Sequence, residues 1–191
     1  MIIFMAFGML VGMGAAVRIS LSLGEKDYDR AERILGNAAF LNLVLGITLA
    51  VVGFIFREPA LRIFGAGPDT MQYASEYYAI ILAGVPFSMM GFSMNNVIRS
   101  EGNARIAMLS MCISAGLNIV LDPIFIFGFG MGVKGAAYAT IISQMVLCVW
   151  VLRHFTSKKS IVKLKKINIR PDSRIIGLIL SIGFAPFFMQ I

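Results

Sequence analysis

The polar residues that could do chemistry in this chain lie four apart within an otherwise apolar segment: Ser110, Ser114, Asn118 and Asp122. Side chains at i and i+4 share one face of a helix, so these four predict a single polar stripe. Counting from Ile106 at about 1.5 Å per residue, Asp122 lies roughly 24 Å into the segment, in the far half of a ~30 Å membrane core. A carboxylate there costs about 2.5–3.5 kcal/mol to insert, which indicates a functional site.

Two interpretations of Asp122 are open. It can take up a proton or a cation on one side of the membrane and release it on the other, as the carboxylate of an ion-coupled carrier does. Alternatively, it caps or kinks the helix before Pro123. Asn118, one turn earlier, favours the first interpretation because an amide supplies both a donor and a carbonyl ligand. Ser110 and Ser114 are weaker candidates, since serines in membrane helices often bond their own helix backbone.

The next apolar segment carries polar residues on one face as well. Thr140, Ser143 and Gln144 stand at i, i+3 and i+4, which places them together on a helix. Only a short glycine-rich turn separates the two segments, so we expect antiparallel neighbours whose polar faces meet.

Composition assigns these segments to a membrane. Of 191 residues, 58% are apolar and 14% charged, and the mean hydropathy is +0.83, against about 25% charged in a typical soluble domain. We expect an all-α integral membrane protein, with residues 1–191 forming a single transmembrane domain. The predicted spans are about 1–17, 34–56, 73–97, 106–130, 135–152 and 175–191.

The net charge of +7 comes from one segment, residues 153–174, which holds eight basic residues and one acid. A basic loop between apolar spans indicates topology and contact with anionic lipid headgroups rather than nucleic acid. The predicted lipid contacts are Lys158, Lys159, Lys163, Lys165 and Lys166. Loops 18–33, 98–105 and 153–174 together hold fourteen Lys and Arg residues, against three in the alternate loops. We therefore place those three loops in the cytoplasm.

Enzyme chemistry is not expected. The single histidine, His154, has no partner ligands near it in sequence, and no Ser/His/Asp or Cys/His arrangement exists. Cys112 and Cys148 both fall in apolar spans, where a thiol is a small apolar filler. We expect no cofactor apart from a coupling ion.

Several segments resemble the multidrug and toxic compound extrusion (MATE) family, collinearly over nearly the whole chain. They are SLGEKDYDRAERILGNA, FGAGPDTMQYASEYYAII leading to GVPF, RSEGNARIAM, and NIVLDPIFIFGFGMGVKGAAYAT. The glycine-rich, methionine-rich texture and the GFAPFFMQ ending are most similar to a bacterial subgroup of that family.

The resemblance implies a twelve-helix carrier of two six-helix lobes, of which this chain is most of the N-terminal lobe without its first helix. It implies export of cationic or amphipathic drugs from a bacterial cell through the cell membrane, in exchange for H⁺ or Na⁺. Asn118 and Asp122 match the family's amide and acid, Thr140 its threonine and Tyr77 its tyrosine. Na⁺ would be held at Asp122 and Asn118. A C-terminal lobe is the implied partner.

Two alternative functions stay open. A lipid-linked oligosaccharide flippase of the same superfamily would carry several basic residues in a central cavity, whereas the spans here hold almost none. The other alternative is a truncated fragment that does not transport.

Overall fold

Long helices build the protein. The computed structural model describes residues 2–63, 65, 67–157 and 160–190, and its described part contains no strand. Six helices within the described residues are long and apolar enough to cross a membrane, which agrees with the number of spans predicted from the sequence. They are α1 (Ile2–Gly24), α2 (Tyr28–Ile55), α4 (Pro68–Ser100), α5 (Ala104–Pro123), α6 (Val133–Thr156) and α7 (Ser173–Gln190).

The loops are shorter than predicted. The expected loop 18–33 is mostly helical: α1 runs on to Gly24 and α2 begins at Tyr28. Asp27 makes this tight turn possible, because its side chain accepts a hydrogen bond from the backbone N–H of Arg30 at 3.0 Å and caps α2. The predicted loop 98–105 is likewise reduced to Glu101–Asn103. Charged residues here extend apolar helices beyond the span that hydropathy alone suggests.

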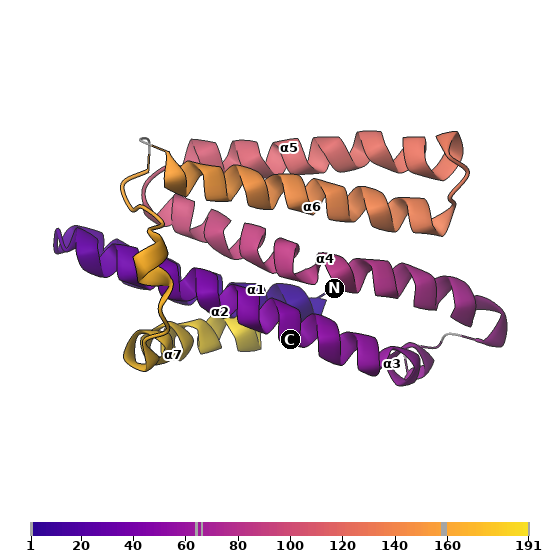
Figure 1. Ribbon diagram of the computed structural model, residues 1–191, viewed down its shortest axis with the longest axis horizontal. Coiled ribbons are helices and arrows are strands. Elements are labelled where there is room, and N and C mark those ends of the chain that lie inside the picture. The colour runs from indigo at the N-terminus through magenta and orange to yellow at the C-terminus, as the bar shows by residue number, and fades with distance from the viewer. Residues whose placement is uncertain (1, 64, 66, 158–159, 191) are drawn as a thin grey trace.

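α4 is the central helix. It packs against α1, α2 and α6, while α5 packs mainly against α6, and α7 packs against α1 and α2. Figure 1 shows α5 and α6 together on one side of α4 and α1, α2 and α7 on the other. The α5–α6 pair therefore forms one wall of the bundle, and α4 with α1 faces it.

Glycines permit the closest helix contacts. A Cβ at Gly183 of α7 would overlap the backbone carbonyl of Leu10, and one at Gly14 of α1 would overlap the carbonyl of Ile179. Small residues at such positions allow backbones to approach, which is how helices associate in lipid. The two glycines hold α7 tightly against α1.

The helix break at Pro123 takes a defined form. α5 passes directly into η1 (Ile124–Gly128), a π-helical turn in which the Phe129 N–H donates to the Ile124 carbonyl at 3.0 Å. Proline has no N–H for the helix ladder, which favours such a local widening. The turn to α6 then uses Gly130 and Gly132, whose φ angles of 63° and 55° favour glycine.

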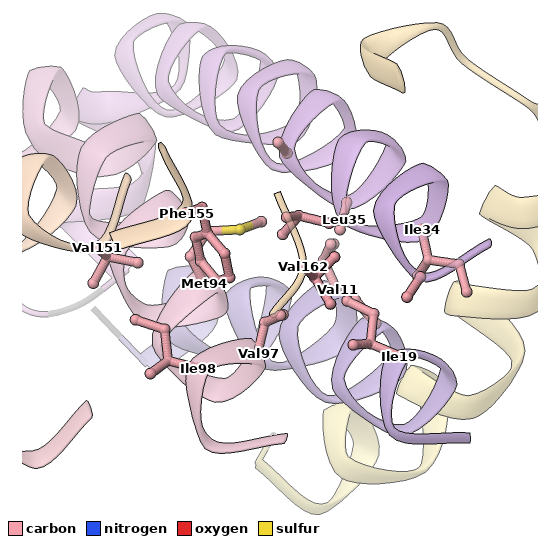
Figure 2. Close-up of a cluster of buried hydrophobic side chains, with 14 of the residues drawn as sticks. Val11, Ile19, Ile34, Leu35, Met94, Val97, Ile98, Val151, Phe155 and Val162 are labelled. Atoms are coloured by element: carbon pink, nitrogen blue, oxygen red, sulfur yellow. The ribbon is translucent and has the colours of Figure 1, made fainter. Parts of the chain in front are cut away.

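The main core lies at the end of the bundle where α1, α4 and α6 end and α2 and α5 begin; we call it the basic end. The fully buried side chains there include Leu35, Met94, Ile98 and Phe155. Val162, from the connection between α6 and α7, inserts among them, as Figure 2 shows. That connection, which includes η2 (Lys166–Ile169), is therefore packed into the bundle.

Candidate functional site

The polar stripe predicted on α5 faces α6 and α4. Ser110 is buried; its hydroxyl donates to the Ala107 carbonyl at 2.8 Å and accepts from Asn95 Nδ2 of α4 at 2.7 Å. Ser114 Oγ donates to the Ser143 carbonyl of α6 at 3.0 Å. The predicted meeting of polar faces on α5 and α6 is therefore confirmed, and it fixes how the two helices are rotated towards each other.

The structure brings three of the four predicted site residues together. Asn118 Nδ2 donates to Asp122 Oδ1 at 3.3 Å and lies 3.5 Å from Thr140 Oγ1, while the Thr140 hydroxyl donates to the Ala136 carbonyl at 2.9 Å. All three side chains are half-buried. Asn118 is thus the link between the carboxylate and the next helix.

Tyr77, the fourth predicted site residue, makes no hydrogen bond to this trio among the described residues. It is half-buried on α4, nine residues before Pro86. Its role in the site stays a prediction.

A cavity of about 350 Å³ opens beside the trio, between α1, α4, α5 and α6. Asn118 and Thr140 line it, whereas Asp122 lies one turn farther along α5 and reaches it through Asn118. The other lining residues are Phe4, Met5, Gly8, Ser88, Met89, Phe92, Met111, Ser114, Ala115, Ser143, Gln144 and Leu147. A largely apolar pocket with a few polar groups is typical of small-molecule sites.

The trio offers the oxygens that a hard cation prefers. Asp122 supplies a carboxylate, Asn118 an amide oxygen and Thr140 a hydroxyl, all within one hydrogen-bonded group. Among the described residues, no cluster of three or more His, Cys, Asp or Glu exists to hold a transition metal. The Asp122 carboxylate can also accept a proton, as any carboxylate can.

A second polar cluster, at the basic end, was missed in the sequence. Glu101 accepts hydrogen bonds from Ser160 Oγ at 2.9 Å and from the Val162 N–H at 3.0 Å, and it lies 3.2 Å from His154 Nε2. The side-chain exposures of His154 and Glu101 are 4% and 0%. His154 has no partner near it in sequence, but the fold brings Glu101 next to it. The two residues are 53 positions apart, so no spacing motif could indicate the contact.

The basic connection between α6 and α7 is tied to the bundle by one of its own lysines. Lys165 Nζ forms an ion pair with Glu32 Oε2 of α2 at 2.6 Å, and this hydrogen bond raises the pKa of Lys165. Lys163 is exposed and Lys166 begins η2, while Lys158 and Lys159 lie outside the described residues. Lys165 thus has a structural contact besides the predicted one with lipid.

Comparison with known proteins identifies the family. The MatE family model matches residues 1–124, which is more than half of the chain. The chain belongs to the MatE family. Two curated relatives are named multidrug export protein MepA, one from Staphylococcus aureus at 32% identity and one from Staphylococcus haemolyticus at 33%. Each alignment covers 99% of this chain and 42% of the relative, so the chain spans about two-fifths of their length.

Solved MatE structures share this fold. One, described as the inward-facing conformation of a multidrug resistance MATE family transporter of the MOP superfamily, matches with a TM-score of 0.93 at 32% identity. The match covers 99% of this chain and 43% of that one. The helices described above are therefore those of the N-terminal lobe of a multi-pass MatE membrane protein, and the bacterial subgroup predicted from sequence texture agrees with the MepA relatives.

Proposed function

We propose that the protein exports cationic or amphipathic drugs across the bacterial cell membrane in exchange for H⁺ or Na⁺, with Asp122 as the coupling carboxylate. The observation that carries the proposal is the bonding of Asp122 inside a membrane span. Asn118 Nδ2 at 3.3 Å is its one hydrogen-bond partner among the described residues, and the bond is long for a carboxylate acceptor. A carboxylate held this loosely can exchange its partner for a proton or a cation.

Asn118 connects this carboxylate to the cavity. It donates to Asp122 and reaches Thr140, and it lines the cavity itself. A proton or Na⁺ on Asp122 neutralises its charge and weakens the hydrogen bond that orients the Asn118 amide, which changes the wall that an exported compound contacts. Antiport requires that the ion at one site changes the binding of the drug at the other, and Asn118 provides such a connection.

The cavity lining favours this function over a lipid-linked oligosaccharide flippase. No described lysine or arginine lines the cavity, whereas phosphate groups are held by basic side chains. Methionine and phenylalanine dominate one wall, and such side chains adapt to apolar compounds of different shapes. The names of the MepA relatives agree with a drug as the exported compound.

The charge distribution and the length of the chain bear on the surroundings of the lobe. We place the basic end in the cytoplasm on the distribution of Lys and Arg, with exposed lysines such as Lys163 at anionic headgroups. A C-terminal lobe would complete the carrier, since the chain spans 42% of its MepA relatives.

The test is Asp122→Asn in the protein expressed from its complete reading frame. We expect ion-driven efflux of a cationic dye from membrane vesicles to be abolished while the protein remains in the membrane, because an amide cannot exchange a proton. Collapsing the proton gradient and the sodium gradient separately identifies the ion. Asp29→Asn, at an exposed carboxylate in the first turn of α2, is the matched control. Undiminished efflux by Asp122→Asn contradicts the coupling role.

A further inference from the structure

The cavity has two chemically different walls. α1 and α4 contribute mainly Phe4, Met5, Met89 and Phe92. The polar side chains lie mostly opposite, on α5 and α6, and Gln144 of α6 is among them. A compound with an apolar body and a polar group would therefore orient its polar group towards α5 and α6.

Most hydroxyl and amide groups that line this cavity already donate their hydrogens to other groups of the protein. The hydroxyl groups of Ser88, Ser114, Thr140 and Ser143 each donate to a backbone carbonyl, at 2.8–3.0 Å. Asn118 Nδ2 is directed at Asp122 and Thr140. These groups are committed to the bundle, and little donor capacity remains in them for a ligand.

Gln144 is the exception. It is half-buried and lines the cavity, and its amide makes no hydrogen bond to any residue that the structure describes. It stands one turn after Thr140 on the same face of α6, so the free amide borders the same space as Asn118 and Thr140. A primary amide offers two N–H donors and a carbonyl acceptor.

We propose that Gln144 is a specificity-determining residue whose amide hydrogen-bonds the polar group of the exported compound. The inference rests on the proposed function and adds a substrate class to it. The favoured compounds are lipophilic cations that carry a carbonyl or amine group able to pair with a primary amide. Cations without such a group bind through the apolar wall alone.

Gln144→Leu in the protein from the complete reading frame tests the assignment with two probes. Rhodamine 6G is a lipophilic cation with an ester carbonyl and secondary amines; tetraphenylphosphonium is a lipophilic cation with no hydrogen-bonding group. One neutral hydrogen bond corresponds to roughly a three- to tenfold change in affinity. We expect Gln144→Leu to weaken rhodamine 6G binding by about that factor and to leave tetraphenylphosphonium binding unchanged.

The control is Gln72→Leu, the same substitution at an exposed glutamine of α4 outside this cavity. We expect it to change neither affinity. Retained tetraphenylphosphonium binding by Gln144→Leu also shows that the variant is folded with an intact cavity. Unchanged rhodamine 6G binding, or equal weakening of both probes, overturns the role of Gln144. If the unaltered protein binds neither cation, the proposed function itself is wrong and this inference falls with it.

Discussion

Glu101, in the turn that precedes α5, and Asp122, in the last turn of α5, are two carboxylates that are bonded in opposite ways. Glu101 is fully buried and contacts Ser160, Val162 and His154, two of which belong to the α6–α7 connection. Asp122 is half-buried and bonded to Asn118 on its own helix. A carboxylate with several buried donors holds segments together, whereas one with a single long bond remains available to a ligand. The same functional group therefore serves assembly at one end of α5 and, in our proposal, exchange at the other.

The largest expected effect is the difference in free energy of unfolding between alanine variants of the two carboxylates. Glu101→Ala leaves His154 and the Val162 N–H without their buried acceptor, while Ser160 Oγ keeps the Val162 carbonyl at 2.7 Å, and we expect a cost of about 3 kcal/mol. Asp122→Ala removes one long bond and should cost less than about 1 kcal/mol. Thermal unfolding midpoints of both variants in the same detergent measure the difference. Equal losses of stability would show that Asp122 is as structural as Glu101.

An intermediate effect is expected inside the Glu101 cluster. His154→Ala removes one of its partners and leaves the Ser160 and Val162 bonds, so we expect a loss of about 1–2 kcal/mol. The double variant with Glu101→Ala should be scarcely less stable than Glu101→Ala alone, because both changes break one network. Additive losses in thermal unfolding would argue against a shared cluster.

The smallest effect is expected at Lys165, which is about half-exposed and paired with Glu32. Because the hydrogen bond to Glu32 raises the pKa of Lys165, the pair stabilises the fold below the ordinary lysine pKa of about 10.4. That contribution is lost as the pH rises through the raised value. The unfolding midpoint should therefore fall more between pH 9 and pH 11 in the unaltered protein than in Lys165→Met.

Lys163→Met, at an exposed lysine two residues earlier, is the matched control and should keep the pH profile of the unaltered protein. High salt should also narrow the gap between Lys165→Met and the unaltered protein, since exposed ion pairs are screened. Identical pH profiles for Lys165→Met and the unaltered protein would mean that the pair contributes nothing to stability.

Local patterns predicted the helices and the centre of the site. The six apolar segments correspond to six helices, among the described residues, that are long and apolar enough to cross a membrane, and the i, i+4 spacing on α5 correctly placed Asn118 beside Asp122. The short turn before α6 correctly brought the polar faces together, as the Ser114 bond to Ser143 confirms. These features follow from helix periodicity and chain connectivity, which act over a few residues.

The long-range contacts could not be predicted in this way. Glu101 and His154 fall in two different predicted loops, 98–105 and 153–174, and nothing in the sequence indicates that Ser160 and Val162 would fold back onto them. The loop 18–33 was expected to be longer because hydropathy cannot distinguish a charged helix end from a turn.

The sequence by itself determined that this is a helical membrane protein with one acid deep in an apolar span, because hydropathy and helix periodicity are local properties. Only the tertiary structure decided which polar groups are used up in bonds and which remain free. In the sequence, Asn118, Thr140 and Gln144 are equally good candidates for contact with a ligand. In the described structure, Asn118 and Thr140 use their donor groups within the protein, whereas the Gln144 side chain lines the cavity without a hydrogen bond to a described residue. That distinction depends on how α4, α5 and α6 pack, and packing is a property of the whole fold.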